Sequence, residues 1–153
     1  MKCQKYILYL FFVPVLFLYS CTPQPCYQTT VASVKADFFQ TGTGKSLTAD
    51  SVTLFALGRD TSKIYSQTTG LHLINIPLDP SSDSCRFYIK INQITDTITF
   101  YYTTYAHIVS KECGYTYYYR LTNPVRHDKL LPDYNTINAE ITTINEENIR
   151  IFY

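Results

Sequence analysis

Residues 96–121 read DTITFYYTTYAHIVSKECGYTYYYRL, and this stretch decides the fold. On both sides of the Val-Ser-Lys-Glu segment at 109–112, apolar or aromatic side chains recur at every second position. A period of two is typical of strands, so the stretch predicts an antiparallel hairpin with one apolar face. The side chains expected on that face are Ile98, Phe100, Tyr102, Thr104, Ala106 and Ile108 in the first strand, and Cys113, Tyr115, Tyr117, Tyr119 and Leu121 in the second.

The turn between the two strands sets the expected register. If Ile108 pairs with Cys113, a four-residue loop closes the hairpin and Tyr102 lies opposite Tyr119. Every apolar residue of both strands then faces one side of the sheet, whereas a one-residue slip would turn one strand inside out. This register places Tyr117 on the apolar, buried face. The opposite face would carry Tyr101 beside Arg120, Thr103 beside Tyr118, and Tyr105 beside Thr116.

Short runs rich in Ile, Val, Thr and Tyr occur along the rest of the chain, and turn-forming residues separate them. No segment shows helical spacing with caps, so the runs predict strands. The Pro-Leu-Asp-Pro-Ser-Ser-Asp run at 77–83 ends one of them. The sequence therefore predicts an all-β domain, a single antiparallel β-sandwich that is immunoglobulin-like or jelly-roll-like. Strands outside the hairpin are expected at 31–39, 51–57, around 64–65, at 71–78, 85–91, 135–144 and 149–153, the last two forming a pair.

The first residues have the organisation of a secretory signal peptide. Lys2 and Lys5 precede an apolar stretch that contains Pro14 and is too short for a transmembrane helix. The stretch ends in Leu-Tyr-Ser-Cys21, which resembles the lipobox of bacterial lipoproteins. In that family the cysteine is acylated and becomes the first residue of the mature chain. The expected division is a signal peptide at 1–20, the lipidated Cys21 with a proline-containing tether at 21–27, and the β-sandwich at 28–153.

Charge and motif spacing argue against several classes of function. Without Lys2 and Lys5, 11 basic residues face 12 acidic ones, so there is no basic excess for nucleic acid. The Gly-Thr-Gly-Lys-Ser segment at 42–46 lacks the first glycine of a phosphate loop, because Phe39 stands there, and we expect a turn. The sequence predicts no catalytic residue, no metal site and no cofactor. The three histidines, expected at the surface or at strand edges, are His72, His107 and His127.

Three cysteines remain after the signal peptide and Cys21 are set aside, so at most one bridge can form within the chain. Cys85 lies on the apolar face of a predicted strand and can stay reduced as a small buried hydrophobe. Cys26 lies where the N-terminal segment would otherwise fray, and Cys113 stands beside Gly114 at the start of a strand. We predict a Cys26–Cys113 disulfide, with Cys85–Cys113 as the alternative.

Four tyrosines lie on outward faces in the expected register: Tyr88, Tyr101, Tyr105 and Tyr118. Exposed aromatic groups often mark interfaces with proteins or carbohydrates. Tyrosine is also a good strand residue that stabilises sheets through cross-strand pairs. Both interpretations stay open, a binding patch or an ordinary strand surface.

Several local motifs occur together in one order along the chain. They are Cys21, Cys26, Pro77-Leu-Asp79, the strand at 96–101, Ser110-Lys-Glu-Cys113-Gly114, and the terminal strand at 148–153. In this layout the chain resembles a family of uncharacterised Bacteroidota lipoproteins, a domain of unknown function. The resemblance implies a membrane anchor and a β-fold, and it brings no known activity.

Three classes of function are consistent with these patterns. The first is a non-catalytic envelope lipoprotein, anchored at the outer membrane and facing the periplasm, that binds an envelope protein or glycan or holds an assembly in place. The second is a pilus or adhesin subunit in which the strand at 149–153 pairs with a neighbour's sheet edge. The third is an envelope hydrolase whose site forms only in the folded chain. We expect the first, because no nucleophile, base or metal cluster is evident in the sequence.

Overall fold

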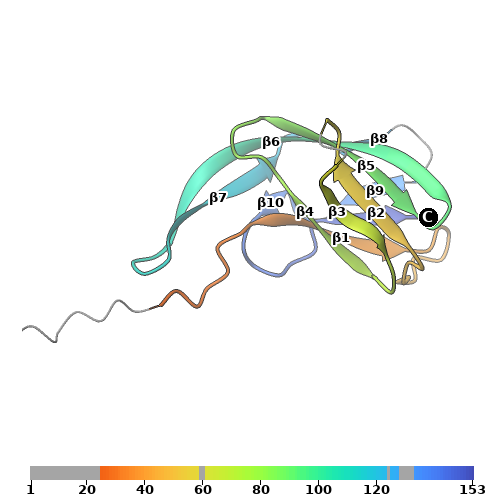
Figure 1. The fold of residues 1–153 in the computed structure, drawn as a ribbon, viewed down its shortest axis with the longest axis horizontal. Helices are drawn as coiled ribbons and strands as arrows, with labels where there is room; N and C mark the ends of the chain where they lie inside the picture. Colours follow the sequence, from red (N-terminus) through yellow and green to blue (C-terminus); the bar gives the residue numbers. More distant parts are fainter. Residues whose placement is uncertain (1–24, 59–60, 124, 128–132) are drawn as a thin grey trace, which may run out of the picture.

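A computed structural model describes residues 25–58, 61–123, 125–127 and 133–153, which fold into two sheets and an extended arm (Figure 1). The expected signal peptide and Cys21 lie outside these residues. In the described part of the chain, no helix is long and apolar enough to cross a membrane. The strands are β1 Ser33–Phe39, β2 Val52–Ala56, β3 Lys63–Thr68, β4 Leu73–Pro77, β5 Ser84–Ile91, β6 Ile94–Ser110, β7 Gly114–Leu121, β8 Arg126–His127, β9 Asp133–Thr136, β10 Glu140–Ile141 and β11 Ile149–Phe152.

The smaller sheet has the order β4-β1-β11-β9, and the larger has the order β10-β7-β6-β5-β2-β3, with β8 also paired to β6. The larger sheet curls into a half-barrel (Figure 1). The prediction of an all-β fold is therefore confirmed. The finer expectation of an immunoglobulin-like or jelly-roll-like connectivity stays a prediction.

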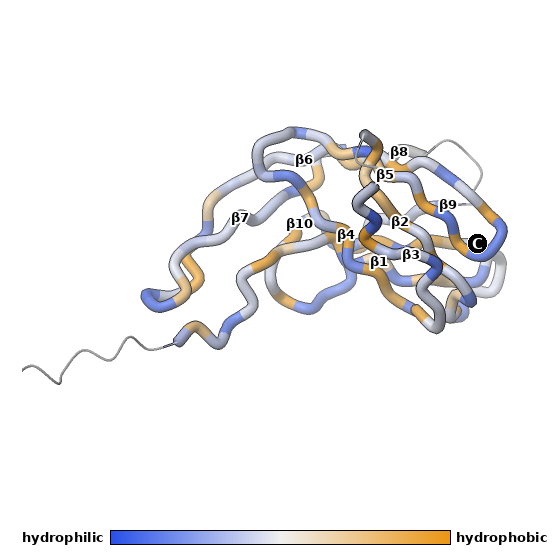
Figure 2. Tube along the Cα trace, viewed as in Figure 1, coloured by the Kyte–Doolittle hydropathy of each residue, from blue (hydrophilic) through white to orange (hydrophobic). Residues whose placement is uncertain are grey.

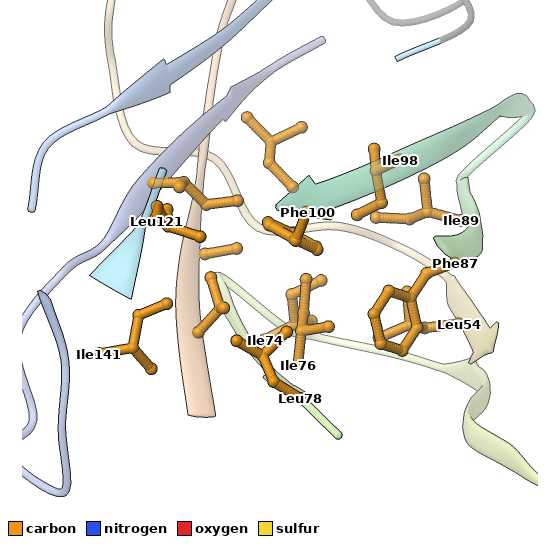
Figure 3. Packing of buried hydrophobic residues seen from close by; sticks show 14 of the residues in the cluster. Leu54, Ile74, Ile76, Leu78, Phe87, Ile89, Ile98, Phe100, Leu121 and Ile141 are labelled. Atoms are coloured by element: carbon orange, nitrogen blue, oxygen red, sulfur yellow. The ribbon is translucent and has the colours of Figure 1, made fainter. Parts of the chain in front are cut away.

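Alternating side chains from both sheets fill the space between them. On β5, Phe87, Ile89 and Ile91 are buried, and on β6 the buried residues include Ile98 and Phe100. Figure 3 shows side chains of the two sheets meeting in this interior, and Figure 2 shows hydrophobic positions recurring along the strands that line it. Each large apolar side chain contributes about 1.5 to 3 kcal/mol when it is fully buried, so this cluster is the main source of stability.

The pairing of β1 with β11 is parallel, with Ala36 opposite Ile149 and Phe38 opposite Ile151. The expectation of a purely antiparallel sandwich is wrong at this pair. A tight turn dictates antiparallel pairing, whereas β1 and β11 are joined only through the rest of the domain. The expected terminal pair is correct in part, because β11 pairs with β9, while β10 lies in the other sheet beside β7.

The hairpin forms where expected, but its register differs by two residues. Tyr102 lies opposite Leu121 and Ile108 opposite Tyr115, rather than opposite Tyr119 and Cys113. The loop has three residues instead of four, and Gly114 follows it with a φ of 72°. A left-handed residue after a three-residue loop creates a bulge, which accounts for the extra shift. A shift of two keeps the strand side chains on their predicted faces. Cys113, expected on the apolar face, lies in the loop, and on the opposite face Thr103 pairs with Arg120 and Tyr105 with Tyr118.

Only the half of the hairpin that lies nearest the body of the protein contributes to the core. Tyr102 and Tyr119 are buried, but Ala106, Ile108 and Tyr117 are exposed although they lie on the same face. The expected burial of Tyr117 is therefore wrong. Strand alternation determines which face a side chain occupies, whereas burial also requires an opposing element, and the smaller sheet does not cover this part of the hairpin.

Asn148 joins three segments on the outer side of the smaller sheet. Its side-chain oxygen accepts from the Lys35 N–H at 3.0 Å, and its amide donates to the carbonyls of Asn138 and Glu140 at 3.2 and 2.9 Å. Its own N–H donates to the Lys35 carbonyl at 3.0 Å. Because Asn148 is buried, these bonds are protected from water, and they hold the turns before β10 and β11 against β1.

Candidate functional site

A two-stranded arm, residues 103–118, extends from the body of the protein (Figure 1). The first half of β6 pairs with β5, and the second half pairs with β7 alone. β10 meets β7 only at Tyr119 and Arg120, so within the described chain the arm's strand pairing is internal. Side chains on both faces of the arm are exposed, among them Tyr105 and His107 on one face and Ile108 and Tyr115 on the other.

The outer face of the arm carries a compact aromatic and polar cluster. The rings of Tyr105 and Tyr118 meet edge to face at 6.0 Å, and the His107 ring stacks on Tyr118 at 4.2 Å. The Tyr105 hydroxyl donates to Glu140 Oε2 at 2.9 Å, and Glu140 also pairs with Arg120. Together these five residues, here called the outer cluster, present ring faces beside a carboxylate and a guanidinium.

The electrostatics of the outer cluster keep the Tyr105 hydroxyl protonated. Desolvation raises the pKa of Tyr105, and the hydrogen bond and charge of Glu140 raise it further, because both disfavour a phenolate beside a carboxylate. Tyr105 is thus a hydrogen-bond donor across the physiological range. The Tyr118 hydroxyl lies 3.0 Å from the Thr143 hydroxyl and is held by it.

The four tyrosines proposed from the sequence do not form one patch. Tyr105 and Tyr118 are in contact, whereas Tyr88 stacks on Phe55, with ring centroids 4.7 Å apart, and lies opposite Thr97. Tyr101 lies on β6 opposite Ser84, where β5 begins. The structure therefore divides the expected patch between the arm and the body of the sheet.

Three members of the outer cluster were not among the sequence-predicted site residues. His107 lies two residues after Tyr105 on β6 and therefore points to the same face of the strand. This alternation could have predicted its place in the outer cluster. Arg120 likewise lies two residues after Tyr118 on β7 and points to the same face. Glu140 comes from β10, which joins the sheet through a distant part of the chain, and no local pattern predicts that contact.

A cleft of about 730 Å³ opens between the turn that follows β4, the start of β5 and the end of β2. Cys85 is a free, partly buried thiol in its wall, and its sulfur lies 3.0 Å from the Tyr102 hydroxyl. That hydroxyl already donates to the Asp79 carbonyl, so the thiol must be the donor in the contact. Burial raises the pKa of Tyr102, which keeps the hydroxyl neutral. The residues that line the cleft include Pro77, Asp79, Ser82, Cys85, Arg86 and Phe87.

This geometry does not activate Cys85. A cysteine nucleophile needs a base that removes its proton, and no histidine is among the described residues lining the cleft. Nor do the described residues bring three His, Cys, Asp or Glu side chains together as possible metal ligands. The cleft can admit a small ligand beside Arg86 and the serines, and the Cys85 thiol in its wall contacts the Tyr102 hydroxyl.

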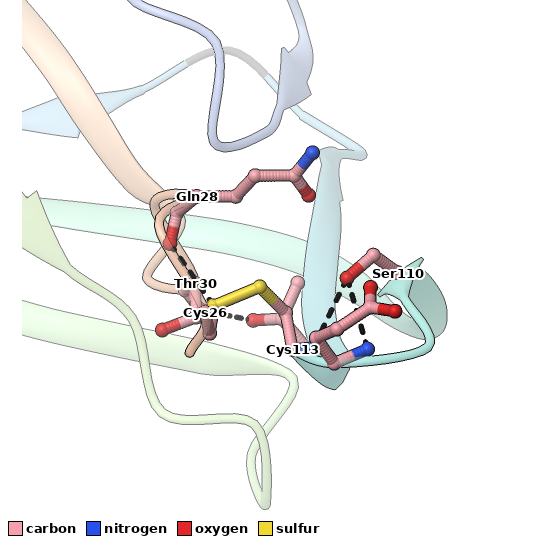
Figure 4. Close-up of a disulfide and its surroundings, with 7 residues drawn as sticks. Cys26, Gln28, Thr30, Ser110 and Cys113 are labelled. Atoms are coloured by element: carbon pink, nitrogen blue, oxygen red, sulfur yellow. Dashed lines mark hydrogen bonds between the residues drawn. A yellow bond between two sulfur atoms is a disulfide. The ribbon is translucent and has the colours of Figure 1, made fainter. Parts of the chain in front are cut away.

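The tip of the arm is fastened to the N-terminal segment by the Cys26–Cys113 disulfide that the sequence predicts (Figure 4). The Cα atoms are 4.9 Å apart, within the usual range. Ser110 Oγ accepts from the N–H groups of Glu112 and Cys113 at 3.2 and 3.0 Å, which shapes the turn that presents the cysteine. The alternative partner, Cys85, lies on β5 opposite Phe100, far along β6 from the tip.

A second contact reinforces this fastening. The Thr116 hydroxyl donates to the carbonyl of Thr30, so the N-terminal segment follows the arm beyond the disulfide (Figure 4). The Ser-x-x-Cys-Gly motif thus has a physical explanation. Its serine caps the turn, its cysteine forms the bridge, and Gly114 adopts the left-handed conformation that other residues rarely accept.

Comparison with known proteins gives a family and no individual relative. No curated protein and no solved structure matches the chain. The model of one family, described as a family of unknown function (DUF6452), matches residues 51–153. That match covers about two-thirds of the chain and includes every strand from β2 to β11. The protein belongs to the family of unknown function DUF6452.

Proposed function

We propose that the protein is a non-catalytic lipoprotein of the cell envelope, anchored through Cys21, that presents the outer cluster to an envelope glycan. The observation that carries the proposal is the disulfide between Cys26 and the tip of the arm. A disulfide is typical of an exported protein. The signal peptide and lipobox that the sequence predicts would also require export. We further propose an outer-membrane location facing the periplasm, as in the Bacteroidota lipoproteins that the sequence resembles.

The chemistry of the outer cluster favours a sugar over an apolar partner. Tyr105 is 42% exposed, and sugar C–H groups can pack on the accessible part of its ring. Glu140 and Arg120 supply an acceptor and donors within reach of the same ring, and aliphatic side chains are absent from these five residues. A binding role also agrees with the lack of an activated nucleophile at Cys85.

Binding to soluble envelope glycans, such as peptidoglycan fragments and lipopolysaccharide oligosaccharides, tests this function. The protein should bind one of them by calorimetry, and the Tyr105→Ala/His107→Ala variant should lose that binding. Tyr88→Ala serves as the matched control, because it removes an outer-face tyrosine far from the cluster. Equal affinity in both variants, or no binding of any glycan, would contradict the proposal.

The anchor is tested separately. Wild-type protein expressed with its leader should carry acyl groups on Cys21, detected in the intact mass and by partition into detergent. Cys21→Ala should lose the acyl mass. A mature N-terminus at another residue would show that the lipobox is not used.

The alternatives suggested by the sequence receive less support. An assembly strand at 149–153 needs a free edge, but β11 pairs with β1 on one side and β9 on the other. A pilus or adhesin subunit would therefore have to use another edge. A hydrolase would need a base beside Cys85 or a serine, and the described lining of the cleft offers no histidine.

A further inference from the structure

We propose that the tip of the arm docks into the interface of the phospholipid bilayer, so that the protein is held by its lipid and by a protein contact. The contact residues are Ile108 and Tyr115 on the arm, with Tyr27 and Val31 on the segment bridged to it. This inference rests on the proposed anchor at Cys21. It concerns a different surface from the outer cluster.

Apolar exposure at the arm tip motivates the proposal. Ile108 and Tyr115 face each other across the hairpin, and their exposed fractions are 76% and 65%. Val31 and Tyr27 are 68% and 85% exposed on the neighbouring N-terminal segment. Figure 2 shows a hydrophobic stretch near the end of the arm, beside the polar turn. Two pairs of exposed aliphatic and aromatic side chains thus lie on the two segments that the disulfide joins, and exposed apolar groups gathered in this way mark an interaction surface.

The length of chain between the lipid and the tip identifies the partner. Cys21 and Cys26 are five residues apart, and a fully extended chain spans about 3.3 to 3.6 Å per residue, so the tether reaches at most about 18 Å. Because the Cα atoms of Cys26 and Cys113 are 4.9 Å apart, the end of the arm lies at most about 23 Å from the acylated residue. Ile108 and Tyr115 lie about two residue pairs from the turn, or roughly 7 Å along the strands.

The disulfide makes this proximity obligatory. Without it, the next contact of the N-terminal segment with the arm is the hydrogen bond between Thr116 and Thr30, so the tether would be longer and the arm tip less closely held to the lipid. With it, the arm tip is the part of the domain fastened nearest to the lipid.

The chemistry of the tip suits an interface rather than the hydrocarbon core. Tyrosine is enriched at the boundary between water and lipid, where its ring is buried and its hydroxyl is hydrated. Lys111 and Glu112 at the turn have opposite charges, so they add no net attraction or repulsion for headgroups. We therefore expect docking to zwitterionic and anionic lipid alike, with little dependence on salt.

The absence of tryptophan from the sequence allows a direct test. Mature acylated protein carrying Ile108→Trp is reconstituted into vesicles that contain brominated phosphatidylcholine. Gln93→Trp is the control, since Gln93 is exposed in the turn between β5 and β6, at the far end of β6 and about 50 Å along the chain from Ile108 at about 3.3 Å per residue. We expect a blue shift and loss of most emission for Ile108→Trp, and neither change for Gln93→Trp. Tyr115→Trp provides a second reporter in case the first variant misfolds.

Removing the bridge tests the role assigned to it. Cys26→Ser in the Ile108→Trp background should reduce the quenching, because the arm is no longer held near the lipid. Undiminished quenching would overturn the role of the disulfide. A blue shift that depends on protein concentration and not on lipid would mean that a second copy covers the tip, and would overturn the docking proposal.

The failure of docking and the failure of the anchor are distinguishable. Intact mass reports acylation before vesicles are added. Acylated protein whose Ile108→Trp emission is unquenched would overturn docking and leave the anchor standing. If the protein carries no acyl chain, the anchor fails, and the same reporters still decide whether the tip meets added vesicles.

Discussion

The hydroxyl of Tyr102 and the main chain of Asp79 exchange two hydrogen bonds. The hydroxyl donates to the Asp79 carbonyl at 2.9 Å, and the Asp79 N–H donates to the hydroxyl at 3.2 Å. The Tyr119 hydroxyl donates to the adjacent Leu78 carbonyl at 3.2 Å. Two tyrosines from the root of the arm thus hold the turn that follows β4, which gives the Pro-Leu-Asp motif at 77–79 a physical role.

Tyr102→Phe should lower the free energy of unfolding by about 1 to 3 kcal/mol, because it leaves the main-chain groups of Asp79 and the Cys85 thiol without their partner. Tyr88→Phe is the control. It removes a hydroxyl while keeping the ring that stacks on Phe55, so its effect should be below about 0.5 kcal/mol. Urea unfolding followed by circular dichroism measures both, and equal losses would show that the Tyr102 hydroxyl contributes nothing specific.

The two halves of the hairpin should differ in their contribution to stability. Tyr119→Ala removes a buried ring that packs on Tyr102 and should cost about 3 kcal/mol or more. Tyr117→Ala lies two residues farther along the same face, where the side chain is exposed, and should cost less than about 1 kcal/mol. Denaturant midpoints of the two variants compare them directly. A large loss at Tyr117 would mean that another element covers the arm.

Loss of the disulfide should destabilise the fold mainly through the unfolded state. The bridge closes a loop of 87 residues, which corresponds to at most about 4 to 5 kcal/mol in the chain-entropy model. Cys26→Ser/Cys113→Ser should therefore unfold at a lower urea concentration than the oxidised wild type. Cys85→Ser is a control that keeps the bridge. Peptide mapping without reductant should recover Cys26 with Cys113, and a bridged Cys85 peptide would refute the assignment.

Asn148→Ala should be among the most destabilising single polar substitutions in the smaller sheet. It leaves the Lys35 N–H and two carbonyls without their side-chain partner in a buried position, which costs about 2 to 4 kcal/mol when the groups stay dry. Asn75→Ala, at an exposed position of β4, is the matched control. Thermal unfolding that gave the same midpoint for both would show that water replaces the lost bonds.

Asp37 should make stability depend on pH. Burial raises the pKa of this carboxyl above its usual 3.8, and Glu147 raises it further against the opposing effects of His72 and Arg150. The native state therefore binds the proton more tightly than the unfolded state, and wild-type stability falls as pH rises from 3.8 through the native pKa. Asp37→Asn should be more stable than wild type at pH 7, and the two should converge below 3.8. A constant difference across this range would contradict the prediction.

Local alternation made much of the fold predictable. The strand containing Phe87, Ile89 and Ile91 and the faces of the hairpin follow from a period of two, because each side chain needs only its neighbours to define its side. The Cys26–Cys113 bridge was predictable for a related reason, since Cys85 belonged to an apolar strand face. The two-residue shift in the register of the hairpin was not predictable, because it depends on the conformation that Gly114 adopts in the turn.

Contacts between distant segments were beyond local patterns. Nothing in the sequence near Glu140 indicates that it meets Tyr105, and nothing near Asn148 indicates its bonds to Lys35. The exposure of Tyr117 depends on where the opposing sheet ends. The alternation of side chains along a strand does not predict that position. The candidate site and the smaller sheet depend on such contacts between distant segments.

The parallel pairing of β1 with β11 has a consequence for the order of events in biosynthesis. β1 emerges from the ribosome early, but the edge that it offers to Ile149–Phe152 stays open until those residues have been made. Contacts of such long sequence separation form slowly. A chain that has emerged only as far as the arm would expose an unpaired, apolar edge, and such edges recruit other strands. We infer that β1 is most exposed to wrong pairing in the interval before Ile149–Phe152 has joined the sheet.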